Sequence, residues 1–314
     1  MATLRGDADL WLAVLNRFDP ELVLSHSDTR PRLGGIGPGA LNSGRVLHVD
    51  NELRYEKIYL DRSRCLRRMR HAYDTVLGPL RPVPFPPIRR LRRGKRLVAV
   101  EFAFVDGLDH HRPQPLLALE SARRLAAIPM PEGLRSGGLV ESYPRDLRWA
   151  QDRLLARSRK PAPGAAAPGW LRPGLRAMLQ RLAPQDRSLA ARLPARLERW
   201  AARLQSAPRV FSHGDLNRAN LTAEGVLIDW DNAAWRAFGH DAAYATAFHS
   251  KAADLDALLA LSAQQVERPG HERADRFAYL WFLLHLLPEA GPNRMPPSLA
   301  EALIGALERL ELRL

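Results

Sequence analysis

Three polar residues stand at a fixed spacing in the segment HGDLNRANLTAEGVLIDWDN, which covers positions 213–232. Asp215 is followed five residues later by Asn220, and Asp229 comes directly after the short apolar run VLI. In phosphoryl transfer one carboxylate accepts the proton of the attacking hydroxyl, while an amide and a second carboxylate bind Mg²⁺ on the nucleotide phosphates. The segment therefore predicts a phosphoryl-transfer site.

Short apolar strands are predicted on both sides of this loop, at residues 210–212 and 226–228. The first strand leaves Asp215 on a loop, where its carboxylate can reach a substrate hydroxyl. The second ends at Asp229, and a carboxylate at a strand end is well placed to bind a metal. A single Asp or Asn in a loop is most often a turn or cap residue. The combination of residue types and spacings is what favours the catalytic interpretation here.

The motifs HGDLNRAN and LIDWDN resemble those of the aminoglycoside phosphotransferase and choline kinase family in residue type and in spacing. The resemblance implies an α+β, two-lobed protein-kinase-like fold, with a small, mainly antiparallel β lobe that has one main helix and a larger, mainly helical lobe. It also implies that Asp215 is the catalytic base and that Asn220 and Asp229 bind Mg²⁺. The nucleotide is then ATP, with GTP as the alternative, and His213 braces the loop.

A further aspartate, Asp241, lies in the stretch FGHDAAYA after the motif. This stretch resembles the segment in which the family places an aspartate before a helix. We interpret Asp241 as an N-cap and loop brace, with a catalytic role as the alternative.

Upstream of the motif, the resemblance assigns nucleotide binding to residues of the small lobe. Lys57 in YEKIYL stands on a predicted strand where the family has a lysine for the α and β phosphates, with a solvated strand-edge lysine as the alternative. Gly35 and Gly37 belong to the run GGIGPG, which would cover the phosphates with backbone amides, although a flexible linker also fits its spacing. The helix predicted over 62–77 lacks the glutamate that orients the family's lysine, and Asp74 is the carboxylate that could replace it.

Apolar residues at strand spacing predominate in the first third of the chain, and apolar residues at helical spacing predominate after it. With 314 residues the chain also exceeds the usual size of one compact domain. We therefore predict two lobes, residues 1–104 and 105–314, with an irregular connector at 158–173. The predicted strands of the small lobe are 45–49, 55–60 and two that turn near Gly94, and the predicted helices are 8–18, 62–77, 115–128, 145–157, 174–205 and those from about residue 241 onward.

The formal net charge of +13 is concentrated in one part of the chain. Residues 62–96 hold twelve Arg or Lys and a single acid, Asp74, which together give +11. Such a segment favours an anionic membrane surface or a phosphorylated glycolipid as its partner, with a solvated, arginine-rich face as the alternative. Nucleic acid is disfavoured because only Tyr73 and Phe85 accompany these arginines, which makes a poor platform for base stacking.

Cysteine content and hydropathy narrow the classes of protein further. Cys65 is the single cysteine, which excludes an intramolecular disulfide framework and a multi-thiolate metal site. A reducing compartment fits this content, so we expect a cytoplasmic location, with the inner face of the membrane as a peripheral position. The N-terminal sequence lacks the features of a secretory signal, and the apolar run at 277–287 is too short to span a bilayer.

These observations favour a kinase that moves the γ-phosphate of ATP to a hydroxyl of a sugar, amino alcohol, aminoglycoside or lipid-linked sugar. Two other classes stay open at this point. The missing helix glutamate is compatible with a nucleotide-binding pseudoenzyme or regulatory scaffold. The basic segment 62–96 is compatible with a protein that binds nucleic acid or membranes.

Overall fold

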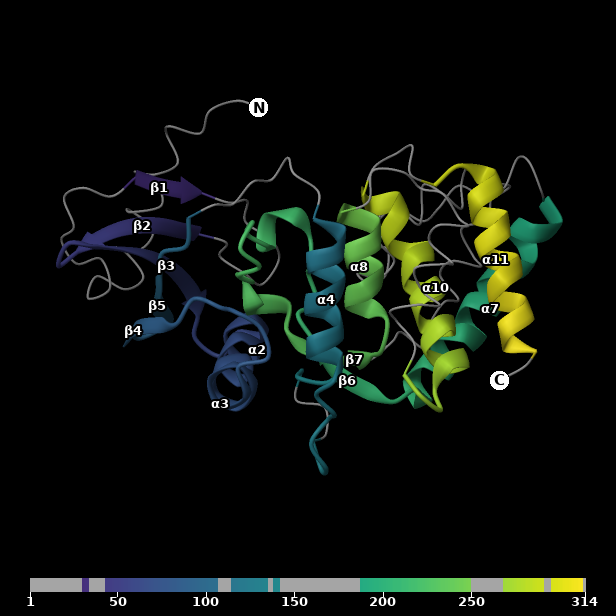
Figure 1. Ribbon diagram of the computed structural model, residues 1–314, viewed down its shortest axis with the longest axis horizontal. Coiled ribbons are helices and arrows are strands. Elements are labelled where there is room, and N and C mark those ends of the chain that lie inside the picture. Colours follow the sequence, from purple (N-terminus) through teal and green to yellow (C-terminus); the bar gives the residue numbers. More distant parts are fainter. Residues whose placement is uncertain are drawn as a thin grey trace. The chain divides into compact units, whose positions relative to one another are not determined.

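A computed structural model (Figure 1) describes residues 30–33, 43–106, 114–134, 138–141, 187–249, 268–290 and 295–312. The chain divides into two compact units. Unit 1 comprises Met1–Asp109 together with Asn220–Ala233, and unit 2 comprises His110–Ala219 together with Ala234–Leu314. The segment that contains Asp229 thus belongs to unit 1, although unit 2 flanks it on both sides in sequence. The lobe boundary after residue 104 stays a prediction.

Unit 1 contains a five-stranded antiparallel sheet in the order β1-β2-β3-β5-β4. Asp50 and Asn51 join β2 to β3, and both have the positive φ that a two-residue hairpin turn requires, 52° and 63°. The predicted hairpin is therefore confirmed. The strands are β1 (Arg30–Leu33), β2 (Ser43–Val49), β3 (Glu52–Leu60), β4 (Ile88–Arg93) and β5 (Leu97–Ala103).

The two faces of this sheet differ in chemistry. On one face Lys57 of β3 stands opposite Val100 of β5, so the cross-strand neighbour of the lysine is apolar. On the other face Glu56 stands opposite Glu101, and both carboxylates are buried. Like charges in opposite positions destabilise a sheet, but here Arg92 of β4 forms ion pairs with both glutamates. The arginine thereby offsets the repulsion between the two glutamates, directly beside Lys57 in β3.

A helix is confirmed in the region predicted over 62–77, but it runs from Arg64 to Leu80 and its winding changes along its length. It begins as α2 (Arg64–His71), where the Ser63 hydroxyl accepts a 3.2 Å hydrogen bond from a backbone amide of the first turn. It continues as a π-helix, η1 (Ala72–Leu77), and ends as the short helix α3 (Gly78–Leu80). Apolar spacing in the sequence reports which face is buried, and it does not resolve this local widening of the turn.

Unit 2 is mainly helical, with a small sheet in which β6 pairs antiparallel with β7. Helix α8 contacts both α4 and α10, and α10 in turn contacts α11. Trp200 of α7 packs edge-on against Phe277 and Trp281 of α10, which places large aromatic rings in the core. The elements are α4 (Pro115–Ala126), α7 (Arg187–Ser206), β6 (Arg209–Ser212), β7 (Ala234–Ala237), α8 (His240–His249), α10 (Glu272–Ala290) and α11 (Pro297–Glu311).

The helical predictions at 115–128, at 174–205 and after residue 241 are thus confirmed as helices within the described residues. The predicted helices at 8–18 and 145–157 and the connector at 158–173 lie outside the described residues. None of the helices that the structure describes is long and apolar enough to cross a membrane.

Candidate active site

Lys57 presents a buried ammonium group that two carboxylates bind. Its Nζ lies 2.8 Å from Asp229 Oδ1 and 2.6 Å from Asp231 Oδ2, and only 7% of the lysine side chain is exposed. Burial by itself would lower the pKa of Lys57, but the charges and hydrogen bonds of Asp229 and Asp231 raise it overall. The lysine therefore stays protonated in the physiological range and offers a fixed positive charge in unit 1.

The segment between Asn220 and Asp229 folds back on itself. The Thr222 amide donates a 3.1 Å hydrogen bond to the Val226 carbonyl, and the Val226 amide donates one of 3.1 Å to the Thr222 side-chain hydroxyl. The Ile228 amide then donates to the Asn220 carbonyl at 3.0 Å. The strand predicted at 226–228 is therefore wrong. The tight turn allows only a single β-bridge, between Leu221 and Leu227. Asp229 follows this bridge with φ 60°, in the left-handed region.

This fold-back brings the two ends of the segment, which carry Asn220 and Asp229, towards each other. The Asp229 side chain is 38% exposed, whereas Asn220 is buried. Mg²⁺ prefers oxygen ligands and is commonly bound through one or two carboxylates together with substrate phosphates and water. Asn220 and Asp229 carry oxygen donors of the kind that such an ion prefers. Within the described ranges, no group of three or more His, Cys, Asp or Glu gathers as a metal site.

Asp215 lies in unit 2, on the loop that follows β6. Its Oδ1 accepts a 2.9 Å hydrogen bond from Asn217 Nδ2, and its backbone amide donates to His213 Nδ1 at 3.3 Å. Asn217 in turn accepts a 2.7 Å hydrogen bond from the Ala219 amide. The carboxylate is thus oriented by an amide two residues further along its own loop. Gly214, with φ 82°, allows the loop to turn between β6 and Asp215.

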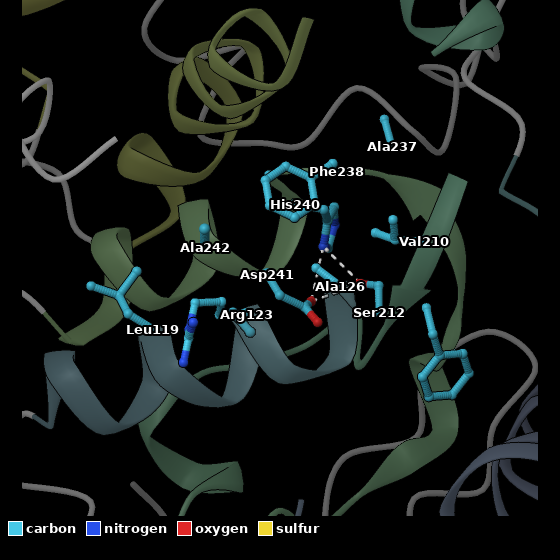
Figure 2. Close-up of a pocket in the computed structure, with 13 residues that line it drawn as sticks. Leu119, Arg123, Ala126, Val210, Ser212, Ala237, Phe238, His240, Asp241 and Ala242 are labelled. Atoms are coloured by element: carbon cyan, nitrogen blue, oxygen red, sulfur yellow. Dashed lines mark hydrogen bonds and ion pairs between the residues drawn. The ribbon is translucent and has the colours of Figure 1, made fainter. Parts of the chain in front are cut away.

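The carboxylate of Asp241 holds the same loop from the first turn of α8 (Figure 2). Because α8 begins at His240, the N-cap position predicted for Asp241 is wrong. Oδ1 accepts hydrogen bonds from the Ser212 hydroxyl at 2.7 Å and the Gly214 amide at 3.0 Å, and Oδ2 accepts one from the His213 amide at 2.7 Å. Burial by itself would raise the pKa of Asp241. The hydrogen bond and charge of His240, the charge of His213 and the hydrogen bond of Ser212 lower it to about 2. Asp241 is therefore ionised at neutral pH.

Ser212, His240 and Asp241 also line a small pocket beside α4 (Figure 2), but they do not form a nucleophilic triad. A triad needs its serine and its aspartate on opposite nitrogens of the imidazole. Here the single atom His240 Nδ1 lies 3.5 Å from Ser212 Oγ and 3.3 Å from Asp241 Oδ1. The serine hydroxyl donates directly to the aspartate instead. This cluster is arranged to hold the loop.

The remaining residues singled out in the sequence lie away from these clusters or outside the described residues. Asp74 lies in η1 with 62% of its side chain exposed, and its carboxylate is 3.7 Å from Arg70. The structure thus does not bring Asp74 to Lys57. Gly35 and Gly37 lie outside the described residues.

Three contact residues were missed in the sequence: Tyr59, Asn217 and Asp231. Two of them follow a recognised aspartate at a spacing of two residues, Asn217 after Asp215 and Asp231 after Asp229. Side chains of Asn and Asp commonly bond to groups two residues away, and this spacing was the available signal. Tyr59 is two residues after Lys57 on β3 and therefore shares its face of the sheet.

A model of the phosphotransferase enzyme family, APH, matches residues 66–277 of the chain. The chain belongs to this family. The APH member described here is thus a kinase that transfers phosphate to a hydroxyl acceptor, and the resemblance seen in HGDLNRAN and LIDWDN is confirmed. No curated protein matches the chain in sequence.

Solved structures similar to this APH-family kinase include a microcompartment-associated aminopropanol kinase. It is 17% identical with a TM-score of 0.50, and the match covers 96% of this chain and 95% of that one. Others are a spectinomycin phosphotransferase in complex with ADP and spectinomycin (14% identity, TM-score 0.44, covering 95% and 93%) and an aminoglycoside phosphotransferase (14%, 0.44, covering 97% and 99%). The antiparallel sheet and the mainly helical second unit agree with the α+β kinase-like fold predicted from the sequence, which is confirmed.

Proposed function

We propose that this kinase transfers the γ-phosphate of ATP to a hydroxyl group of a small molecule. The observation that carries the proposal is the contact of the buried Lys57 ammonium with Asp229. A permanent positive charge for phosphate oxygens and a carboxylate suited to Mg²⁺ thus lie side by side in unit 1. Mg²⁺ held by Asn220 and Asp229 would neutralise charge on the β and γ phosphates.

In the proposed reaction Asp215 is the general base. Its carboxylate accepts the proton of the acceptor hydroxyl while the hydroxyl oxygen forms a bond to the γ-phosphorus. The bond from that phosphorus to the β–γ bridging oxygen breaks, and ADP leaves with the bonding electron pair. Asn217 supports this role because its side-chain amide donates to Asp215 Oδ1 and so orients the carboxylate. Asp241 supports it because it holds the backbone of His213 and Gly214.

For the acceptor we propose a hydroxyl on an amino alcohol, an aminoglycoside, a sugar or a lipid-linked sugar. Amino alcohols and aminoglycosides are the compounds in the names of the structural neighbours, and the fold they share with this chain supports the class without selecting a member. ATP is the proposed donor, with GTP as the alternative, and ADP is the nucleotide bound to the spectinomycin phosphotransferase.

A nucleotide-consumption screen over these acceptor classes tests the proposal. We expect Mg²⁺-dependent release of ADP from ATP with at least one acceptor class, and ³¹P NMR should show a phosphate ester on the acceptor. The Asp215→Asn variant is the blank, because it removes the base and keeps the size of the side chain. Consumption that is equal in the blank, or that yields inorganic phosphate and no ester, would contradict the assigned reaction.

We further propose that the basic segment 62–96 binds an anionic lipid surface or an anionic glycolipid headgroup. Many of its cationic side chains are exposed, and the exposed leucines Leu80 and Leu91 lie among them, 56% and 41% accessible. Apolar side chains set among cations suit the boundary between lipid headgroups and acyl chains. The exposed cations are Arg62, Arg64, Arg67, Arg70, Arg81, Arg89, Arg90, Arg93, Lys95 and Arg96.

Co-sedimentation with vesicles should reveal this binding. We expect the protein to bind vesicles that contain phosphatidylglycerol, to bind pure phosphatidylcholine weakly, and to dissociate at high salt. Changing Arg89, Arg90 and Lys95 together to Gln should weaken binding roughly 100-fold, since each cation near an anionic surface contributes about 1 kcal/mol. The matched control changes three exposed arginines of unit 2 to Gln and should bind nearly as well. Equal binding to neutral and anionic vesicles would rule the surface out. The control arginines are Arg124, Arg199 and Arg203.

A further inference from the structure

We propose that Asp231 is the positioning residue for Lys57 and takes the place of the glutamate that the helix predicted over 62–77 lacks. This inference rests on the proposed function, since it assumes that Lys57 binds nucleotide phosphates. Asp231 was not among the residues that the sequence motif singled out. Its carboxylate nevertheless makes the shorter of the two contacts with the lysine, 2.6 Å against 2.8 Å to Asp229.

The strand that carries the lysine also fixes Asp231. Tyr59 follows Lys57 by two residues on β3, so both side chains lie on one face of the sheet. The Tyr59 hydroxyl donates to Asp231 Oδ1 at 2.7 Å, while Asp231 Oδ2 contacts the lysine. One carboxylate therefore bridges two neighbouring side chains of β3. A bridge of this kind leaves the ammonium little freedom to move.

Asp229 is less suited to act as a permanent anchor. Its side chain is 38% exposed, against 7% for Asp231, and in the proposed function its oxygens also bind Mg²⁺. A carboxylate that binds the metal shares its negative charge with that metal and holds the lysine less strongly. Asp231 is then the partner that keeps Lys57 in place when nucleotide and metal are bound.

Helix α2 supports Asp231 by packing and does not supply the carboxylate itself. It packs against the turn Trp230–Asn232 that contains Asp231. The Asp74 carboxylate beyond α2 is mostly exposed and lies 3.7 Å from Arg70. The carboxylate that orients Lys57 is thus supplied by Asp231, which lies in a turn that packs against the helix, and not by the helix itself.

The first experiment measures the lysine directly, without nucleotide. The chain has four lysines, so ¹⁵N-lysine labelling gives few side-chain signals, and Lys57→Met assigns the one of interest. An ammonium group held by two carboxylates exchanges its protons slowly with water, so we expect the Lys57 signal to be visible at neutral pH. Asp231→Asn should shift it and speed its exchange about tenfold or more. Asp61→Asn, a matched change at the end of β3, should leave it unchanged.

The second experiment separates positioning from a general effect on folding. Adenosine lacks phosphates, so its affinity should not depend on Lys57, whereas the affinity for ATP should. We expect Asp231→Asn to weaken ATP binding with Mg²⁺ about 10- to 100-fold and to leave adenosine binding unchanged. In a Lys57→Met background, the same change should cause no further loss, because interacting residues are not additive.

The outcomes distinguish the two proposals. Equal weakening of ATP and adenosine, or a Lys57 signal that responds to Asp74→Asn and not to Asp231→Asn, would overturn the role of Asp231. A wild-type protein that binds ATP no better than adenosine would instead overturn the proposed nucleotide site. In that case the NMR signal still decides whether Asp231 holds the lysine.

Discussion

Asp215→Asn should lower kcat by a factor on the order of 10³ while the protein folds normally, because a positioned general base contributes roughly 10²–10⁴ to the rate. The substitution replaces one carboxylate oxygen by an amide nitrogen of nearly the same size. The remaining oxygen can still accept the 2.9 Å hydrogen bond from Asn217, so the loop geometry should persist. What is lost is the ability to accept the acceptor's proton.

Steady-state kinetics on the acceptor found by the screen, together with thermal melting, would check this result. Glu224→Gln is the matched control, because it makes the same carboxylate-to-amide change at an exposed residue in the turn after Asn220. The control should keep nearly full activity. If Asp215→Asn retained more than about a tenth of the wild-type kcat, Asp215 would not be acting as a base.

Asp241→Asn should both destabilise unit 2 and lower activity, although Asp241 has no proposed contact with substrate. The carboxylate accepts hydrogen bonds from two backbone amides and the Ser212 hydroxyl. An asparagine in its place would point an NH₂ group at one of these donors and leave a buried amide unsatisfied, which costs roughly 1–3 kcal/mol. We expect a clear fall in melting temperature and a fall in kcat of about tenfold or more, since misplacement of a catalytic group by about 1 Å can cost 10²-fold.

A second buried aspartate separates these two effects. Asp275 of α10 is 2% exposed and forms an ion pair of 2.6 Å with Arg268. Asp275→Asn should therefore lower the melting temperature as well, but it should leave the kcat of the folded protein close to that of wild type. A loss of kcat proportional to the loss of stability in both variants would show that Asp241 has no specific effect on the catalytic loop.

The stabilising effect of Asp241 should depend on pH in the acid range. Its folded-state pKa is lowered to about 2, whereas an aspartate in an unfolded chain titrates near 3.9. A lowered carboxyl pKa gives stability that is fully present above the unfolded value and is lost as the pH falls through the folded one. The difference in the free energy of unfolding between wild type and Asp241→Asn should thus decrease by roughly 2–3 kcal/mol as the pH falls from 5 to 2. Chemical denaturation along this pH series would measure it, and a constant gap would contradict the ionised carboxylate.

The sequence was most informative where a function depends on a short, contiguous motif. HGDLNRAN and LIDWDN predicted the family, and period-two and helical spacings predicted the sheet and the main helices. The roles of Asp215, Asn220 and Asp229 stay predictions, and the structure adds the contacts that orient Asp215 and Asp229. Contacts between residues far apart in the sequence were harder to predict, because a pattern of residue types does not indicate which side chains come into contact after folding.

Asp74 and Asp231 illustrate that difficulty. Position in sequence favoured Asp74, because it lies in the helix where an orienting carboxylate is expected. In the structure Asp74 lies in η1 with its side chain mostly exposed to solvent. Asp231 reaches Lys57 because Asp229 adopts a left-handed conformation and turns the chain, a backbone state that a non-glycine residue seldom shows and that spacing alone does not predict. The strand predicted at 226–228 failed because of the tight turn that precedes Asp229.

The grouping of Asn220–Ala233 with the first part of the chain constrains how such a protein can be divided or recombined. A fragment that stops at residue 109 would contain the buried Lys57 but neither Asp229 nor Asp231, and it would leave that ammonium without the carboxylates that accompany it. A chimera made by exchanging only the first 109 residues with a relative would combine β3 of the relative with the Asp229 and Asp231 segment of this chain. We therefore expect that β3 and residues 220–233 must come from the same parent protein for a chimera to fold and be active.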